Sequence, residues 1–121
     1  MEKKILVNDG ISEEGKKRLI EYQFHVIDEH VKQKDLIKFI QKNKIIAILV
    51  RSATQVKRDI IDSCPTIKLI GRGGVGMDNI DVEYAKKKGI DVINTPNASS
   101  RSVAELVFTH LFSLVRNTYQ S

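Results

Sequence analysis

Six consecutive apolar residues, Ile45 to Val50, form the longest uninterrupted apolar run in the chain. A membrane-spanning helix needs about 20 such residues, so we expect no membrane segment. The run has the length of a strand, yet it lacks the polar alternation of a strand with one solvated face. Such a strand is typical of the centre of a parallel sheet that helices cover on both faces.

Shorter apolar runs precede and follow this central strand, and segments with helical periodicity separate them. The predicted strands cover residues 4–7, 24–27, 45–50, a run that ends at Ile70, and 90–93. The predicted helices cover residues 13–22 and 34–42, a segment with Val56, Ile60 and Ile61 that stops at Pro65, and a segment from near Val82 to near Gly89. Five strands that alternate with helices predict an α/β fold, a doubly wound parallel sheet of order 2-1-3-4-5.

Polar residues follow three of the predicted strands. Asn8 and Asp9 follow the first strand, Arg51 and Ser52 follow the third, and a glycine-rich stretch follows the fourth. The carboxyl ends of parallel strands share one edge of the sheet, and α/β proteins bind ligands there. We therefore expect these three loops to converge on a binding site.

The glycine-rich stretch holds four glycines between positions 71 and 76, with Arg72 among them. Glycines let several backbone N–H groups turn toward one point, and a neighbouring cation favours a carboxylate or phosphate ligand. A plain glycine-rich turn is the alternative. The stretch also spells G-x-G-x-x-G, but we do not interpret it as a dinucleotide fingerprint. The next helix begins several residues later, and the next strand ends in Asn94 where that fingerprint would need an acid.

Composition excludes several classes of function. The net charge is +5, but the basic residues are spread along the chain without aromatic neighbours, so we expect small anionic ligands and no nucleic acid. No His, Cys and carboxylate cluster has the spacing of metal ligands, so no metal site is expected. The single cysteine, Cys64, has the apolar helical spacing of a core residue and no histidine close in sequence. A lone cysteine and a first strand that starts at once after Met1 predict a cytoplasmic protein.

The last segment is predicted to be a helix that begins with the capping box of Ser102 and Glu105 and runs to about Arg116. Its residues are apolar on nearly every side, and such a helix must be covered on more than one face. One five-stranded domain covers only one face. We therefore expect a second domain or subunit against the other face, and we expect this chain to be the front part of a longer protein.

Three motifs occur in a fixed order: Val50–Thr54, Gly71–Asp81, and Asn94–Asn97 followed by Ser102–Glu105. In this order and spacing they resemble the D-isomer-specific 2-hydroxyacid dehydrogenases, most closely the members that act on 3-phospho-D-glycerate in serine biosynthesis. The resemblance implies an NAD-dependent oxidoreductase that moves a hydride between C2 of a 2-hydroxyacid and NAD. Separately, the apolar last helix, which needs a cover, predicts a homo-oligomer.

The resemblance further implies a division of the chain. Residues 1–101 would be a flavodoxin-like substrate-binding domain, and residues 102–121 would be the helix that connects it to a Rossmann domain, which binds NAD. The family's catalytic arginine, glutamate and histidine would lie beyond residue 121. We therefore assign no catalytic residue to this chain, and His25, His30 and His110 match no catalytic motif. The chain alone is expected to be inactive and to hold NAD weakly.

Substrate recognition is what the resemblance places within this chain. The backbone N–H groups of residues 74–76 would hold the substrate carboxylate, while Arg51 and Arg72 would face its phosphate. The implied substrate-binding set is Arg51, Ser52, Arg72, Gly73, Gly74, Val75 and Gly76, and the implied cofactor-binding set is Val75, Asn97 and Ser100. The alternative for Arg51 is a surface salt bridge, for example to Asp9. The alternative for Asn97 and Ser100 is turn formation and helix entry.

Two non-enzymatic functions compete with this interpretation. A non-catalytic binding module of the same fold, corepressor-like or regulatory, would use the apolar last helix as its partner surface. A phospho-receiver domain shares the predicted strand order, but it needs an acidic residue after the third strand. Arg51 and Ser52 occupy that place, which disfavours the receiver.

Overall fold

The computed structural model describes residues 3–9, 13–51, 53–73, 79–95, 105 and 107–111. The strands are β1 (Lys4–Val7), β2 (His25–Ile27), β3 (Ala47–Val50), β4 (Leu69–Gly73) and β5 (Asp91–Thr95). The helices are α1 (Glu13–Glu21), the short 3-10 helix η1 (Gln33–Asp35), α2 (Leu36–Asn43), α3 (Arg58–Ser63) and α4 (Val82–Lys87). All neighbouring strands are parallel and their order is β2-β1-β3-β4-β5, which confirms the predicted α/β topology.

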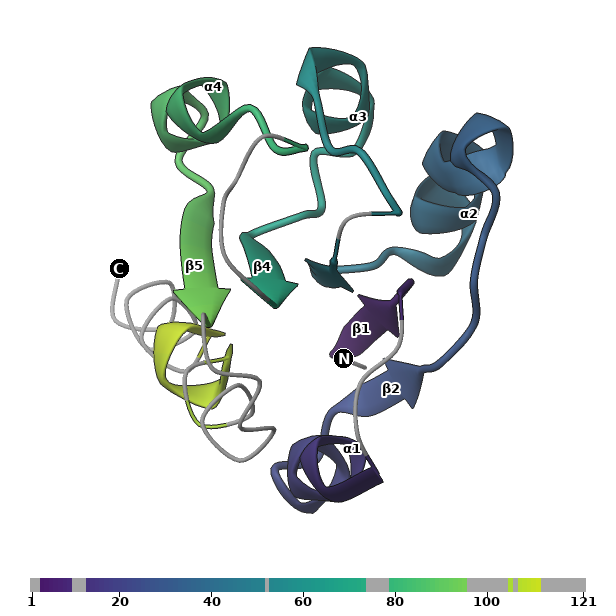
Figure 1. Ribbon diagram of the computed structural model, residues 1–121, viewed down its shortest axis with the longest axis vertical. Coiled ribbons are helices and arrows are strands. Elements are labelled where there is room, and N and C mark those ends of the chain that lie inside the picture. Colours follow the sequence, from purple (N-terminus) through teal and green to yellow (C-terminus); the bar gives the residue numbers. More distant parts are fainter. Residues whose placement is uncertain are drawn as a thin grey trace.

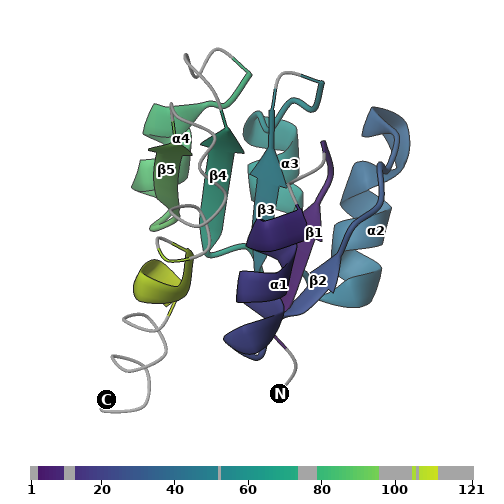
Figure 2. The ribbon, with the colours of Figure 1, turned by 60° about the horizontal axis from the view of Figure 1, so that its bottom comes forward.

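Helices cover both faces of the sheet (Figures 1 and 2). α2, α3 and α4 lie on one face. α1 lies on the other face with a C-terminal helical segment, residues 107–111. The ring of Phe108 in this segment stacks on that of Tyr22, which directly follows α1, with 4.2 Å between the ring centroids.

The central strand is buried on both sides, as its apolar run predicts. All four residues of β3 are buried, with Ile48 and Val50 in the core under α2, α3 and α4. Ala47 and Leu49 face the second core, under α1 and residues 107–111. Each fully buried branched side chain contributes about 1.5–3 kcal/mol of burial free energy, so β3 stabilises both layers at once.

Helix α4 begins and ends where local chemistry predicts. The Asp81 side chain accepts a hydrogen bond from the Tyr84 backbone N–H at 3.2 Å. This bond, assisted by Arg58, holds the pKa of Asp81 below its usual value. Beyond the last turn, Gly89 takes φ +81°, a left-handed conformation that glycine adopts without strain.

Three predicted boundaries are wrong. β4 runs on to Gly73 instead of ending at Ile70, and β5 runs on to Thr95 instead of ending at Ile93. The two extensions pair with each other, because β4 and β5 stay in register up to the last residue of each. Val56 does not belong to α3, but forms an isolated parallel bridge with Ile80.

Gly71 therefore has a different role from the predicted loop glycine. It lies in the middle of β4, paired with Leu49 on one side and Ile93 on the other. A Cβ atom at position 71 would lie 2.6 Å from Leu49 Cδ2, closer than side chains approach in real proteins. Close packing, rather than backbone freedom, explains this glycine.

The C-terminal helical segment packs on the sheet with one described face. Val107 and Leu111 are buried in the second core, and His110 Nδ1 lies 3.0 Å from Asp91 Oδ2 at the start of β5. The predicted capping box and the outer apolar face fall largely on residues outside the described part. Within the described residues, no helix is long and apolar enough to span a membrane.

Candidate functional site

The carboxyl ends of β1, β3 and β4 are neighbours in the sheet. Leu49 pairs with Val7 on one side and Val50 pairs with Arg72 on the other. The loops after β1 and β3 and the end of β4 consequently share one edge. We refer to the described residues of these loops, with Asn79, as the carboxyl-edge network.

Asp9 organises the loop after β3. Its side chain is only 3% exposed. One carboxyl oxygen accepts from the backbone N–H groups of Arg51 at 2.7 Å and Thr54 at 3.1 Å. The other accepts from the Thr54 hydroxyl at 2.6 Å. The loop that carries Arg51 is thus held by a buried acidic side chain from the neighbouring strand.

Asn8 adds a second buried anchor, and every polar atom of its side chain is used. Its side-chain nitrogen donates to the Val31 carbonyl oxygen at 3.1 Å and to the Thr54 hydroxyl at 2.8 Å. Its side-chain oxygen accepts from the Val31 backbone N–H at 2.7 Å. The chain of bonds from Asn8 through Thr54 to Asp9 polarises in one direction, which strengthens each member in a buried setting.

Asn79 connects the two arginine-bearing segments. Its side-chain oxygen accepts from Arg72 Nε at 2.6 Å. Its side-chain nitrogen donates to the carbonyl oxygens of Arg51 at 2.5 Å and Thr54 at 2.6 Å. The Asn79 carbonyl oxygen also accepts from the Val56 backbone N–H at 2.8 Å, beside the isolated bridge between Val56 and Ile80. The Arg72 guanidinium is thereby oriented by one amide that also fixes the loop after β3.

The two arginines differ in solvent exposure and in their contacts. Arg72 is half-buried, and its NH1 group also reaches the Gly73 carbonyl oxygen at 3.4 Å. Arg51 is exposed, and its side chain makes no ion pair within the described residues. The alternative of a salt bridge between Arg51 and Asp9 is wrong there, because Asp9 accepts backbone N–H groups and the Thr54 hydroxyl.

A hollow of about 340 Å³ opens beside β1, on the side of β2. Its lining residues are Asn8, Asp9, Asp28, Glu29, His30 and Ala53. His30 Nδ1 lies 2.8 Å from the Asn8 carbonyl oxygen and 3.5 Å from Asp9 Oδ1. The exposed carboxylates Asp28 and Glu29 make this side unfavourable for an anion. An anionic ligand is favoured on the opposite side of the network, near the two arginines.

The predicted site residues divide into two groups. Arg51, Arg72 and Gly73 lie on the described carboxyl edge. The remaining ones lie outside the described residues: Ser52, Gly74, Val75, Gly76, Asn97 and Ser100. Sequence reasoning missed the linking roles of Thr54 and Asn79. Only the meeting of two loops in space reveals the contacts of Asn79, while Asp81 caps α4.

The described residues do not form a dinucleotide site. In such a site a helix opens directly among the glycines, and its N-terminus binds the pyrophosphate. Here Gly71 and Gly73 belong to β4, and the next described helix begins at Val82.

The single cysteine is a core residue, as its apolar spacing predicts. Cys64 is fully buried, and burial, with a smaller effect of Asp59, raises the pKa of its thiol to about 11. A thiol so protonated is a poor nucleophile. His25 is an exposed strand residue and His30 an exposed loop residue. No group of His, Cys, Asp and Glu side chains within the described residues could hold a metal ion.

Comparison with known proteins identifies the family. Residues 5–118 match the family model described as D-isomer specific 2-hydroxyacid dehydrogenase, catalytic domain. The chain belongs to this family. Members are NAD-dependent dehydrogenases of 2-hydroxyacids, which agrees with the motifs at the carboxyl edge.

Two curated relatives match almost the whole chain. A D-3-phosphoglycerate dehydrogenase from Methanocaldococcus jannaschii is 42% identical over 98% of this chain. A hydroxypyruvate reductase from Thermotoga maritima is 41% identical over 94% of it. The chain spans 22% of the first relative and 37% of the second. A solved structure of a Pyrococcus horikoshii protein covers 99% of this chain, and the chain covers 35% of it, with a TM-score of 0.71 and 26% identity.

Proposed function

We propose that this chain is the substrate-binding part of an NAD-dependent D-2-hydroxyacid dehydrogenase that acts on 3-phospho-D-glycerate. The observation that carries the proposal is the link made by Asn79 between Arg72 and the loop of Arg51. Two cations on adjacent strand ends suit a dianionic phosphate better than a single carboxylate. The name of the Methanocaldococcus relative agrees with a phosphorylated substrate.

In this proposal each part of the edge has one task. Arg51 and Arg72 bind the phosphate, with Ser52 and Gly73 beside them, and the N–H groups of residues 74–76 bind the carboxylate. Val75, Asn97 and Ser100 border the nicotinamide. The chain thus holds C2 of the substrate toward NAD, which the Rossmann domain of the intact parent would bind.

The domain arrangement is part of the same proposal. Residues 1–101 form the substrate-binding domain and residues 102–121 connect it to the Rossmann domain of the parent. A homo-oligomer and a cytoplasmic location remain predictions from the sequence. The chain by itself is expected to bind the substrate weakly and to catalyse no turnover of NAD.

The test uses the intact dehydrogenase that carries this chain, with Arg72→Ala. A charge-assisted hydrogen bond contributes about 1.5–3 kcal/mol, so KM for 3-phosphoglycerate should rise about ten- to a hundredfold. KM for unphosphorylated glycerate or hydroxypyruvate should change less than about threefold. Arg58→Ala removes an exposed arginine of α3 and serves as the control for loss of one positive charge.

Equal effects of Arg72→Ala on phosphorylated and plain substrates would remove the phosphate-binding role. They would favour a substrate like that in the name of the Thermotoga relative. A parent that neither oxidises the hydroxyacids nor reduces hydroxypyruvate would favour the alternative of a non-catalytic binding module. Turnover of NAD by the purified 121-residue chain would contradict the assignment of the catalytic groups to the rest of the parent.

A further inference from the structure

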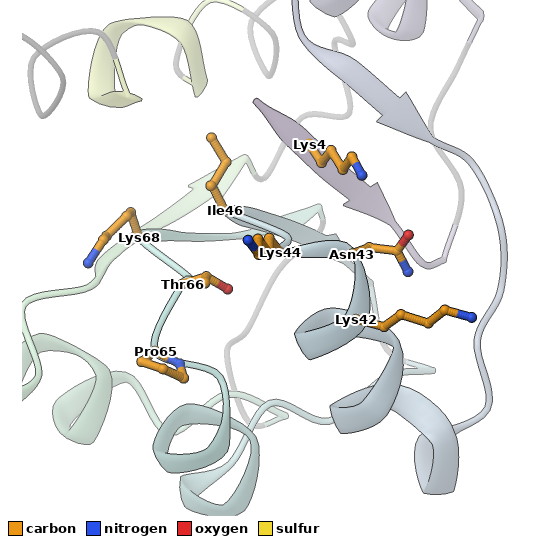
Figure 3. Close-up of a pocket in the computed structure, with 8 residues that line it drawn as sticks. All are labelled: Lys4, Lys42, Asn43, Lys44, Ile46, Pro65, Thr66 and Lys68. Carbon is orange, nitrogen blue, oxygen red and sulfur yellow. The ribbon is translucent and has the colours of Figure 1, made fainter. Parts of the chain in front are cut away.

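The opposite edge of the sheet, where β1, β3 and β4 begin, carries a groove of about 600 Å³ (Figure 3). We call it the lysine groove. Its lining residues are Lys4, Lys42, Asn43, Lys44, Ile46, Pro65, Thr66 and Lys68. Four of these eight residues are lysines and none is acidic.

We propose that the lysine groove binds a small polyvalent phosphate, a diphosphate or triphosphate that is free or attached to a nucleoside. The four lysines come from three separate parts of the chain: the start of β1, the end of α2, and the residue before β4. The fold therefore collects positive charges that the sequence keeps apart. Like charges brought to one groove repel each other, and a multivalent anion relieves that repulsion.

Three of the four lysine charges of the groove are not neutralised within the described part of the chain. Lys42, Lys44 and Lys68 are exposed, and their side chains form no ion pair with any described residue. Elsewhere on the surface, lysines do have acidic partners, as in the pairs Lys16–Asp28 at 3.4 Å and Lys88–Asp62 at 3.8 Å. The groove thus gathers three exposed positive charges that no described carboxylate neutralises.

Helix-end electrostatics account for only half of the cluster. Lysines favour the C-terminal end of a helix, which explains Lys42 and Lys44 at the end of α2. Lys4 and Lys68 lie at strand beginnings, where no helix dipole attracts them. Lys44 also takes φ 54° and ψ 51°, a left-handed conformation that glycine or asparagine adopts more readily. Helix capping alone would favour one of those residues there.

The floor of the groove suits the rest of a nucleotide. Figure 3 shows Lys4, Lys44 and Lys68 arranged around Ile46, with the ammonium end of Lys42 farthest from Ile46 in this view. Ile46 is half-buried, and the Thr66 hydroxyl donates to the Ile45 carbonyl oxygen at 2.8 Å. The volume lies within the range of about 300–1,000 Å³ for small-molecule sites. Lysine acts as a point charge for phosphate, so these cations do not need fixed geometry.

The test is calorimetric titration of the 121-residue chain with pyrophosphate, ATP and orthophosphate at one ionic strength. We expect pyrophosphate and ATP to bind at least about tenfold more tightly than orthophosphate. The double variant Lys44→Gln/Lys68→Gln should weaken pyrophosphate binding about tenfold. The control Lys86→Gln/Lys87→Gln removes the same charge from the exposed end of α4 and should change it less than about twofold. Circular dichroism checks that both variants fold.

The comparison of pyrophosphate with ATP separates a free phosphate ligand from a nucleotide. Tighter binding of ATP than of pyrophosphate would mean that the nucleoside contacts the apolar floor. Equal binding would mean that the groove recognises the phosphates alone. Equal loss in both double variants, or equal affinity for all three anions, would overturn the proposal in favour of unspecific charge attraction. The readout is binding to this chain, so it does not depend on the proposed dehydrogenase function.

Discussion

The two edges of the sheet use polar side chains in opposite ways. At the carboxyl edge, Asn8, Asp9 and Thr54 are buried and bonded to one another and to the backbone. At the amino edge, the lysines are displayed at the surface above apolar residues such as Ile46. The first arrangement fixes geometry at the cost of burying polar groups, and the second provides charge with little geometric restraint.

This difference indicates what each edge can recognise. A network in which Asn79 fixes both the Arg72 guanidinium and the loop of Arg51 suits a ligand that must be oriented for a reaction. A groove of flexible lysines suits a ligand that only has to be held, with an affinity that falls as salt is added.

The largest effect is expected for Asp9→Ala at the carboxyl edge. It leaves two backbone N–H groups and the hydroxyl of buried Thr54 without their acceptor, so the free energy of unfolding should fall by about 3 kcal/mol. Denaturant unfolding measures the loss. Asp28→Ala is the control, because its ion pair with Lys16 is partly exposed and should contribute less than about 1 kcal/mol. Equal losses would mean that the buried network is no more important than a surface pair.

The reactivity of the Cys64 thiol tests whether water is excluded from the core near the amino edge of the sheet. Cys64 lies between α3 and β4. A thiol pKa of about 11 in place of 9.0 leaves about a hundredfold less thiolate at pH 8 in the folded chain than in the unfolded chain. Labelling with a disulfide reagent should therefore be about a hundredfold slower in the native protein. Because the raised pKa favours the protonated form, its contribution to stability is complete below pH 9 and is lost as the pH rises from 9 toward 11. Rapid labelling at pH 8 would contradict the burial.

Gly71→Ala tests close packing inside β4, between the two edges. The added methyl would meet Leu49 Cδ2 at 2.6 Å, so unfolding free energy should fall by about 1–3 kcal/mol. Gly89→Ala is the comparison, because position 89 has open space and a left-handed backbone. Leu49→Val shortens the side chain that the added methyl group would meet. The double variant Gly71→Ala/Leu49→Val should therefore lose less unfolding free energy than the sum of the two single changes, whereas combining Leu49→Val with Gly89→Ala should give no such relief. Additive effects of the two changes would refute the steric explanation.

The smallest effect is expected for Asp81→Ala, which removes the cap of α4. The melting temperature should fall by about a few degrees near neutral pH. The lowered pKa of Asp81 favours the ionised form in the folded state. Its contribution is therefore present above the unfolded value of 3.8 and is lost as the pH falls below it. Wild type and variant should converge in acid, and a constant difference at all pH values would contradict the cap.

Much of the fold could be predicted because each element has its own local signal. The apolar run at Ile45–Val50 predicts a central strand, and Asp81 and Gly89 mark the ends of α4. The ends of β4 and β5 could not be predicted in this way. Gly73 and Thr95 extend the strands only because each has the other as a partner, and a single sequence does not display that pairing.

The candidate site was predictable in position but not in construction. Strand order alone places Asp9, Arg51 and Arg72 at one edge. The bonds of Asn79 to residues of two other segments depend on how the loops meet in space. Polar residues in loops carry too many possible roles for spacing to choose one, so the network had to be seen in three dimensions.

The packing of residues 107–111 has a consequence for synthesis of the chain. Val107 and Leu111 close the same apolar face that Ile5 and Val7 of β1 begin. While the ribosome is still making these residues, all five strands have been translated but that face has no complete cover. Contacts of such long sequence separation form late, and the open face is the part of a nascent chain most exposed to aggregation. A nascent chain of which only the part up to β5 has left the ribosome should therefore depend on chaperones more than one of which residues 107–111 have emerged too.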